Sequence, residues 1–401
     1  MSGVRWYDQV LRAEKRYLAG THRTVDPKAT LEKAKSLMRP LGITRLANLT
    51  GLDCLGIPVF TAIRPNGRSL STAQGKGLDD DAAAASALME SIETWHAEHL
   101  QLPRRRGPPR SLESQLELVD LEKLPRASHH RIDRSAPLDW VEGWDLMRAR
   151  PVWVPVEAVT LDCVVPEDHE PVFDVSSNGL ASGNHLLEAI CHGLSEVIER
   201  DAEATWRGKR GQKRVKLETV EDPSCRAVIE RARAAGVMVA VWDIRSEVDV
   251  PAYGAAFMED PREPAWRSLG MYQGFGCHLS PEVALLRALT EAARTRLTYI
   301  AGSRDDFLPE DYARSTDAAV LERVWADLTQ PAPGSVAWVD HRTAPRRSGP
   351  SFEADVETLL GRLRATGSKS AIAVDLSRPE HGVPVVKVLI PGRATAVEAL
   401  G

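Results

Sequence analysis

Cysteine is scarce in this 401-residue sequence, and its few cysteines form no metal-binding pattern. They are scattered along the chain at Cys54, Cys163, Cys191, Cys225 and Cys277. None is spaced as C-x-x-C, which excludes a zinc ribbon, and an odd number of dispersed cysteines argues against a disulfide framework. This usage is typical of a protein from a reducing compartment.

Long apolar runs and an excess of positive charge are also missing. No apolar segment approaches the roughly 20 residues that a membrane-spanning helix needs. The opening MSGVRWYDQV is followed by charged residues rather than by the apolar core of a secretory signal. The net charge of −5 argues against nucleic acid or an anionic membrane as the main partner. We therefore expect a cytoplasmic protein that binds neither nucleic acid nor membrane.

Short strand-like segments alternate with helical ones along most of the chain. Helical patterns cover 80–100 and 185–207, and a Gly-containing turn followed by a helix is predicted over about 274–300. PVWVPVEAVTLD, MVAVWDI, PAYGAAFME and PVVKVLIP are typical of strands. This alternation predicts an α/β (α+β) fold in which helices pack on mixed sheets.

The chain is predicted to have a short leading segment and one main domain. Residues 1–35 have a charged helical pattern, and 101–136, which contain LPRRRGPPR, are predicted to be a solvated surface excursion. We expect an N-terminal helical segment over 1–40 and a main domain over 41–401. Within that domain the distinctive motifs lie at about 42–310, and 311–401 form a strand-rich C-terminal part.

An internal repeat is the most informative pattern. ALMESIE (87–93), GLSEVIE (193–199) and ALTEAAR (288–294) share a small residue, a leucine and a glutamate in the same register, and each follows a Gly-bearing segment. The spacing from Gly77 to Glu90 equals that from Gly183 to Glu196. The sequence therefore predicts repeated strand–turn–helix units.

Acidic side chains form stripes on the repeated helices. Ser86, Glu90 and Glu93 fall at i, i+4 and i+7, and a second stripe is formed by Glu188, His192, Glu196 and Glu199. The first acidic pair has no Lys or Arg within one turn. Buried carboxylates brought face to face need a cation, and oxygen ligands without thiolates favour Mg²⁺ or Mn²⁺. Because Mg²⁺ commonly bridges to phosphates, the implied ligand is a nucleotide.

Three other interpretations of local motifs are open. The Gly-bearing segments precede helix N-termini, which favour anions, although none matches a Walker A or a complete dinucleotide fingerprint. Glu93-Thr-Trp-His96 is a Glu-x-x-His, the ligand pattern of di-iron bundles, but it occurs once and the chain is rich in strand. Cys277-His278 could be a nucleophile and its base.

Taken together, the motifs resemble those of the YcaO family of ATP-dependent enzymes. The matching segments are GTHRTVDPKATL (20–31), GITRLANLTGLDCLGIPVF (42–60), STAQGKGLDDDAAAASALMESIETWHAE (71–98), SSNGLASGNHLLEAICHGLSEVIERDA (176–202), GFGCHLSPEVALLRALTEAARTRL (274–297) and GSRDDF (302–307). The resemblance implies the YcaO-like fold and a nucleotide site in which helix-borne glutamates hold Mg²⁺ on the phosphates of ATP.

The resemblance also implies particular site residues. Metal ligands are expected at Glu90, Glu93, Glu196 and Glu199, and nucleotide contacts at Arg23, Lys76, Ser86, Asn184, Glu188 and Arg200. The chain departs from the family pattern at Ala181 and Thr30, where some members have serine. No nucleotide contact is expected from those two positions.

The activity implied by the resemblance is modification of a peptide backbone. Members use ATP to phosphorylate an amide oxygen, after which a nucleophile adds and phosphate leaves. The N-terminal motifs are similar to those of members that act with a TfuA partner, so we expect thioamide formation on a peptide or protein. An azoline-forming cyclodehydratase and an inactive nucleotide-binding scaffold are the alternatives. A homodimer is a further expectation.

Overall fold

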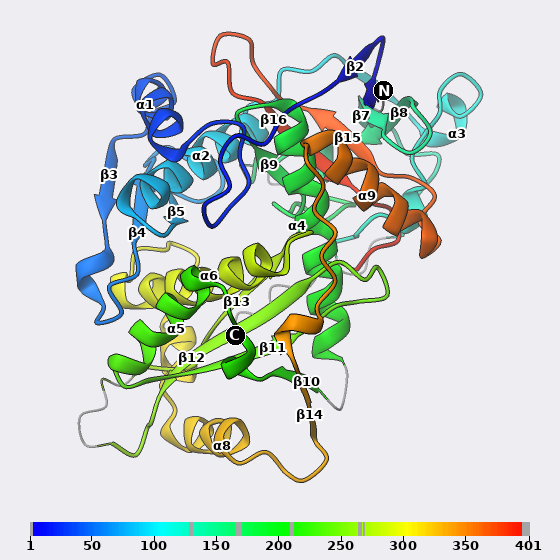
Figure 1. Ribbon diagram of the computed structural model, residues 1–401. Coiled ribbons are helices and arrows are strands. Elements are labelled where there is room, and N and C mark those ends of the chain that lie inside the picture. The colour runs from blue at the N-terminus through cyan, green and yellow to red at the C-terminus, as the bar shows by residue number, and fades with distance from the viewer. Residues whose placement is uncertain are drawn as a thin grey trace.

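The part of the chain that the structure describes folds into four β-sheets with helices packed on them, as the computed structural model shows (Figure 1). The structure describes residues 3–127, 131–164, 171–208, 212–263, 267 and 269–394. Strand pairs are antiparallel except for β10 and β14, which pair in parallel. The predicted α/β (α+β) class with mixed sheets is therefore confirmed.

Three large sheets and one hairpin contain the strands. The five-stranded sheet has the order β13 (Tyr272–Cys277), β12 (Ala252–Glu259), β11 (Val237–Asp243), β10 (Gln212–Val215) and β14 (Val336–Val339). The six-stranded sheet has the order β6 (Arg104–Gly107), β7 (Leu138–Asp145), β15 (Ile372–Asp375), β16 (Val385–Leu389) and β9 (Leu180–Ser182), with β8 (Arg150–Pro155) paired to β7. The three-stranded sheet consists of β3 (Arg45–Asn48), β4 (Val59–Ile63) and β5 (Thr72–Lys76), and the hairpin of β1 (Val4–Trp6) and β2 (Gln9–Leu11).

Helices connect and cover these sheets. The α-helices are α1 (Pro27–Leu37), α2 (Asp80–Glu98), α3 (Pro109–Leu112), α4 (Leu186–Arg207), α5 (Pro223–Ala234), α6 (Pro281–Ala301), α7 (Pro309–Ser315), α8 (Ala318–Thr329) and α9 (Phe352–Ala365). Short 3-10 turns lie at Thr50–Leu52, Leu121–Lys123, Val156–Ala158, Leu217–Thr219 and His341–Thr343. Among the described residues, the search for a helix both long and apolar enough to cross a membrane found none.

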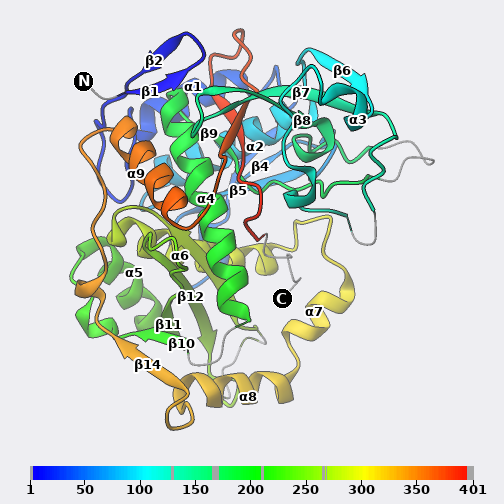
Figure 2. The same cartoon turned by 90° about the vertical axis from the view of Figure 1, so that its right-hand side faces the viewer.

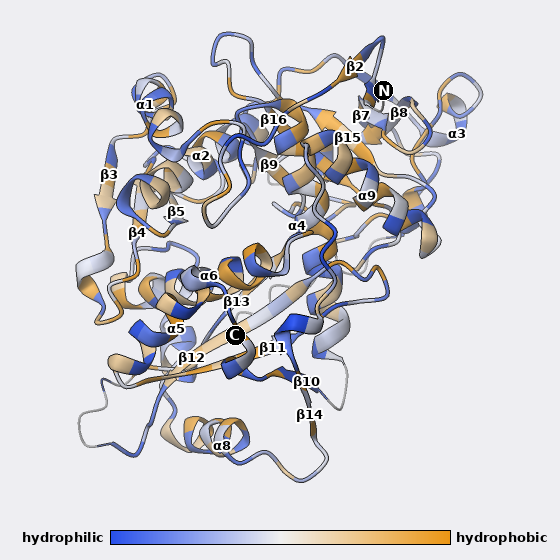
Figure 3. Ribbon diagram, in the orientation of Figure 1, coloured by the Kyte–Doolittle hydropathy of each residue, from blue (hydrophilic) through white to orange (hydrophobic). Residues whose placement is uncertain are grey.

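Helix α4 lies at the centre of the molecule and packs against both the six-stranded and the five-stranded sheets (Figures 1 and 2). Its apolar stripe of Leu187, Ile190, Leu194 and Ile198 is at most 1% exposed. Burying each such side chain contributes about 1.5–3 kcal/mol. Apolar residues also concentrate where α6 meets β12 and β13 (Figure 3). Because the apolar faces of α2, α4 and α6 pack on the sheets, the polar stripes of these helices are turned toward one another.

Two expectations about peripheral segments are wrong in part. The predicted helix over 1–35 is helical only within α1, because the preceding residues form the β1–β2 hairpin and an extended segment anchored by a bridge between Tyr17 and Arg23. The segment 101–136 includes β6, an edge strand that carries the arginine run, and residues 128–130 of it lie outside the described residues. Local charge indicated solvent exposure there but could not reveal pairing to β7.

Candidate active site

The three predicted repeats are strand–turn–helix units: β5–α2, β9–α4 and β13–α6. Each repeat strand is the edge strand of its own sheet among the described residues. The site therefore forms where three sheet edges and three helices converge. Glu90, Glu196 and Glu291 occupy the same register position in the three helices, and Glu93, Glu199 and Arg294 occupy the position one turn later.

Glycines in the repeat strands allow the strand backbone to touch the helix backbone. A Cβ atom at Gly75 would overlap the backbones of Ala83 and Ala87, and one at Gly276 would overlap the equivalent atoms of α6. At Gly77 a Cβ atom would lie 2.6 Å from the nitrogen of Ala83. These glycines are needed for close strand–helix packing, and Gly75 and Gly276 lie in strands rather than in turns.

The expectation of an anion at the N-terminus of the first repeated helix is wrong. Asp79 caps α2 by accepting a hydrogen bond from the nitrogen of Ala82, and Asp80 and Asp81 follow in the first turn. Three carboxylates at this end repel an anion and already complement the helix dipole. The polar stripe that can bind a ligand starts further along α2.

Each helix contacts the edge strand of another repeat through the later of its two stripe positions. Glu93 of α2 hydrogen-bonds to Ser182 of β9, and Glu199 of α4 accepts a 2.7 Å hydrogen bond from the backbone nitrogen of Cys277 in β13. In the third unit Arg294 of α6 replaces the acid and lies 3.5 Å from the carbonyl oxygen of Gln74 in β5. In the first two units an acid accepts a hydrogen bond from the neighbouring strand, whereas in the third unit an arginine donates toward a carbonyl oxygen. The three contacts link the three units into a closed ring.

Three carboxylates in this ring form no ion pair in the part of the chain that the structure describes. No ion pair among the described residues includes Glu93, Glu196 or Glu199, whereas Glu90 lies 3.6 Å from Arg294. Burial raises the pKa of Glu196 to about 7. Burial, and next the charge of Glu196, raises the pKa of Glu93 well above its usual value, and burial also raises the pKa of Glu199. Acids held in this way are stabilised by an added cation.

Positive side chains lie close to these acids. Lys76 of β5 pairs with Glu291, which also accepts a 3.1 Å contact from Arg294. Burial lowers the pKa of Lys76 to about 8. Although burial opposes it, the charges of Lys76 and Arg294 hold the pKa of Glu291 below its usual range. In the third repeat the acid Glu291 is therefore paired with Arg294 of its own helix. In the other two repeats the acids have no such arginine at the position one turn later.

Arg287 is a site residue that the predicted set omits. Its Nη2 lies 3.1 Å from Nε2 of His192, and its buried Nε has no hydrogen-bond partner among the described residues. Burial, followed by the charge of Arg287, lowers the pKa of His192, so the neutral imidazole accepts the hydrogen bond. A guanidinium held by a neutral group keeps its charge available for an anion. The shared stripe of Arg287, Glu291 and Arg294 on the third repeat was the sequence signal for this group.

The remaining predicted nucleotide contacts surround one end of the ring. Glu188 accepts hydrogen bonds from the backbone and hydroxyl of Thr24 at 2.9 and 2.8 Å, and Arg23 lies 3.5 Å from its other oxygen. Glu188 thus anchors the N-terminal segment that presents Arg23. The side-chain amide of Asn184 lies 3.0 Å from the hydroxyl oxygen of Thr30.

Arg200 and Ser86 extend the polar stripes of their helices. Arg200 pairs with Glu203 at 3.2 Å, and although burial opposes it, the charges of Glu199 and Glu291 raise its pKa. The negative charges of the ring therefore act on the Arg200 guanidinium. Ser86 is half-buried one turn before Glu90. The predicted residues are brought together on neighbouring elements; their binding roles remain predictions.

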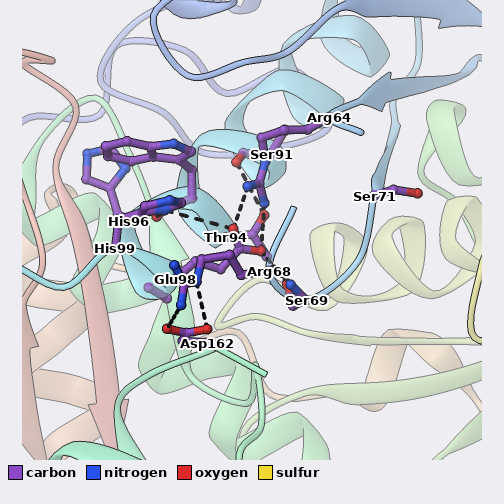
Figure 4. A network of polar contacts seen from close by, with 12 residues as sticks. Arg64, Arg68, Ser69, Ser71, Ser91, Thr94, His96, Glu98, His99 and Asp162 are labelled. Carbon is purple, nitrogen blue, oxygen red and sulfur yellow. Dashed lines mark hydrogen bonds and ion pairs between the residues drawn. The ribbon is translucent and has the colours of Figure 1, made fainter. Parts of the chain in front are cut away.

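Helix α2 is anchored at its C-terminal end, which fixes the position of its acids. Glu98 is 3% exposed and forms a bidentate ion pair with Arg64 of the β4–β5 connection, with Nη2 to Oε1 at 2.8 Å (Figure 4). The same carboxylate accepts hydrogen bonds from Ser69, and Arg68 beside it binds Asp162. This network ties the start of β5 to the end of α2.

Neither histidine alternative has the required geometry. His96 turns away from Glu93, since its ring nitrogens contact the carbonyl oxygen of Ile92 at 2.7 Å and His381 at 3.0 Å. Burial raises the pKa of the Cys277 thiol well above its usual value, and Nδ1 of His278 accepts from the nitrogen of Ser280. A protonated thiol beside an occupied imidazole is unsuited to nucleophilic attack.

A second group of possible metal ligands is already neutralised. Atoms of His22, His278 and Asp355 lie within 4.8 Å of one another. However, the ammonium of Lys15 is 2.5 Å from Asp355 and is almost fully buried beside it. Burial lowers the pKa of both histidines, so they stay neutral. The group is an internal ion pair flanked by imidazoles, and the unpaired ring carboxylates suit a divalent cation better.

Sequence comparisons identify relatives of the whole chain. A family model described as "YcaO cyclodehydratase, ATP- and Mg²⁺-binding" matches residues 74–394. A Rhizobium leguminosarum bv. trifolii protein described as an uncharacterized protein in the tfuA 3′ region is 36% identical over 383 residues, covering 92% of this chain and 88% of that protein. An uncharacterized protein of Methanothermobacter thermautotrophicus is 34% identical over 376 residues, covering 92% and 94%.

Solved structures share the fold. The structure of YcaO from Methanopyrus kandleri bound with AMPPCP and Mg²⁺ has a TM-score of 0.74 and 26% identity, with 95% of each chain covered. A heterocyclase in complex with substrate and cofactor has a TM-score of 0.80 at 24% identity, and this chain spans 54% of its length while 96% of this chain is covered. At that identity the second likeness shows the fold alone.

The comparisons agree with the expectations of family, fold and cofactors. The matched family model is described as binding ATP and Mg²⁺, and it extends over all three repeats and the unpaired carboxylates. The relatives cover nearly the whole chain rather than one motif. The chain therefore belongs to the YcaO family.

Proposed function

We propose that this protein uses ATP and Mg²⁺ to phosphorylate a backbone amide oxygen of a peptide or protein, and that sulfur then replaces that oxygen to give a thioamide. The observation that carries the proposal is the ring of carboxylates at Glu93, Glu196 and Glu199, half-buried or buried and without an ion pair among the described residues, near the cations Arg287 and Lys76. Such a ring is complementary to Mg²⁺ and to the phosphates that Mg²⁺ binds.

The residues have distinct tasks in this proposal. Glu93, Glu196 and Glu199 would hold Mg²⁺, with Glu90 as a further ligand once it is released from Arg294. Bound Mg²⁺ would neutralise charge that develops on the transferred phosphoryl group. Contacts to the nucleotide would come from Arg23, Lys76, Ser86, Asn184, Glu188, Arg200 and Arg287. Of these, Glu188 acts by orienting Arg23, to which it is bound.

The reaction balances with a hydrosulfide donor as co-reactant. The amide oxygen forms a bond to the γ-phosphorus as ADP leaves. Hydrosulfide then adds to the activated carbon, and the carbon–oxygen bond breaks to release phosphate. The oxygen of the amide thus ends in phosphate, and no oxidant or reductant is consumed.

The thioamide product is supported by the Rhizobium relative, whose description places it in the tfuA 3′ region. We propose that a TfuA-type partner likewise serves this chain by delivering sulfur or substrate. The second candidate, azoline formation, is supported by the family description as a cyclodehydratase. In that case a neighbouring Cys, Ser or Thr side chain of the substrate would be the nucleophile.

Peptide mass spectrometry of cells with and without the gene tests the proposal. Thioamide formation adds about 16 Da to a peptide, whereas cyclodehydration removes about 18 Da. We expect the heavier peptide in cells that express the wild-type protein and its absence in cells that express Glu196→Gln. A peptide that loses mass would establish the second candidate. Equal proteomes in the two strains would refute both.

A further inference from the structure

Lys387 is a buried lysine that the proposed function leaves without a task. It lies on β16 on the same face of the sheet as Val385 and Leu389, within an apolar cluster packed against α2, and it is 2% exposed. Placing an ammonium group at such a position costs free energy unless it is paired. No ion pair among the described residues includes Lys387, and its ammonium group donates a hydrogen bond to the carbonyl oxygen of Ser176.

The ammonium group lies beside the carboxylate ring. The charges of Glu196, Asp174 and Glu93 all act on Lys387, with that of Glu196 the strongest. Ser182, which binds Glu93, pairs with Val385 two residues before the lysine in the adjoining strand. Lys387 therefore reaches the ring from the side of β16, whereas Arg23 and Arg287 approach it from the N-terminal segment and from α6.

A small cavity adjoins this lysine. Its volume is about 40 Å³, and its lining includes Lys387, Asn178, Ser176, Asp174, Val197 and Leu389. Val197, which lines the cavity, follows Glu196 on α4, so the cavity and the ring share this helix. The buried Oδ1 of Asn178 has no hydrogen-bond partner among the described residues. The ammonium of Lys387 and the unpaired Oδ1 of Asn178 give this mainly apolar cavity two polar groups, and its volume exceeds the roughly 10–15 Å³ that one water needs, so it can hold a small polar group.

The free groups at this cavity match a backbone amide. Lys387 has N–H donors beyond the one that Ser176 accepts, and Asn178 has a free acceptor. A secondary amide has one carbonyl acceptor and one N–H donor. We infer that Lys387 and Asn178 bind the reacting amide of the peptide substrate: the lysine donates to the carbonyl oxygen, and Oδ1 of the asparagine accepts from the N–H.

This inference rests on the proposed function and assigns its acceptor site. Lys387 would be a catalytic residue, because the oxygen that it contacts is the atom that becomes phosphorylated. It would polarise the carbonyl group and hold it beside the carboxylate ring. The nucleotide and the peptide would then approach the ring from different sides.

The test combines nucleotide binding with peptide modification in Lys387→Met and Asn178→Leu. Binding of AMPPCP with Mg²⁺, measured by calorimetry, should stay within about threefold of wild type in both variants. Each variant is also expressed in a strain that lacks the gene, and the amount of modified peptide is measured. For Lys387→Met this amount should fall about 100-fold, because removing one hydrogen-bond donor to a reacting oxygen usually slows catalysis by about that factor. Lys387→Arg should recover part of the modification, and Lys369→Met, at an exposed lysine, should behave as wild type.

Three results would overturn the inference. Wild-type levels of modified peptide in Lys387→Met and Asn178→Leu would show that the cavity holds only water. A parallel loss of AMPPCP binding would assign the lysine to the nucleotide site instead. A wild-type strain without modified peptide would refute the proposed function itself, and that outcome is read independently of the variants. Should Lys387→Met fail to fold, Asn178→Leu provides the same comparison.

Discussion

Three glutamates determine what this site can bind, because they are half-buried or buried on neighbouring helices and form no ion pair in the part of the chain that the structure describes. Glu196 and Glu93 influence each other across α4 and α2, and Glu199 is fixed by the backbone of Cys277. A carboxylate in such a place either keeps a proton or acquires a cation. The ionisation of these glutamates should therefore make a pH-dependent contribution to stability that bound Mg²⁺ removes.

The contribution of Glu196 to the free energy of unfolding of the metal-free protein should fall as pH rises from about 4.5 to 7. Glu196 has a pKa of about 7 in the folded protein and an ordinary value of 4.5 when exposed, so at this group the folded state binds more protons in that interval. This contribution decreases by an amount on the order of 1 kcal/mol per pH unit, whereas the histidines whose pKa is lowered by burial contribute in the opposite direction. Denaturant unfolding in EDTA at several pH values measures this slope.

Glu196→Gln is the matched variant for that measurement. It removes the titrating group but keeps its size, so its stability relative to that of the wild type should increase as pH rises from 4.5 to 7. Added Mg²⁺ should cancel the contribution of Glu196 to the wild-type slope. Identical slopes in EDTA for the wild type and the variant would contradict the assignment.

At the scale of elements, the strand–turn–helix unit depends on glycine. Gly75→Ala places a Cβ atom against the backbone of α2, which cannot move without shifting the helix. We expect a loss of about 1–3 kcal/mol or more in the free energy of unfolding. Gly51→Ala is the control, since a Cβ atom there meets nothing within 4 Å and should change stability by less than about 0.5 kcal/mol. Equal effects of the two substitutions on chemical unfolding would refute this packing role.

The Arg64–Glu98 pair should contribute strongly to holding α2 in place. Glu98→Ala leaves a buried guanidinium without its partner, which typically costs about 3–5 kcal/mol. Glu122→Ala breaks the exposed pair with Arg126 and should cost less than about 1 kcal/mol. Thermal unfolding of both variants makes the comparison. A similar small effect at both sites would mean that the network in Figure 4 does not anchor the helix.

The sequence predicted the repeated helices but not how they meet. The registers of Glu90, Glu196 and Glu291 could be read directly, since helical periodicity is local. That each repeat strand is a sheet edge, and that Arg294 closes the ring on Gln74, depends on pairing between distant segments. The local sequence did not identify Lys387 as a candidate site residue. A single lysine within an apolar strand can be assigned a role only when the residues that surround it in the fold are known.

At the scale of the whole molecule, three sheets and three helices bring one polar ring to their junction. The six-stranded and five-stranded sheets lie on either side of α4, and the three-stranded sheet brings Lys76 to α6 (Figures 1 and 2). Each unit alone offers one or two charged side chains. Only the closed arrangement concentrates three unpaired acids opposite several cations, which is the combination that a metal–nucleotide complex requires.

Calorimetric titration with AMPPCP, in Mg²⁺ and in EDTA, tests this central claim most directly. We predict binding that requires Mg²⁺ in the wild type and no detectable binding in Glu196→Gln or Glu199→Gln, although both variants should fold and be at least as stable, since each loses a repelling charge. Unchanged AMPPCP affinity in both variants would contradict the account.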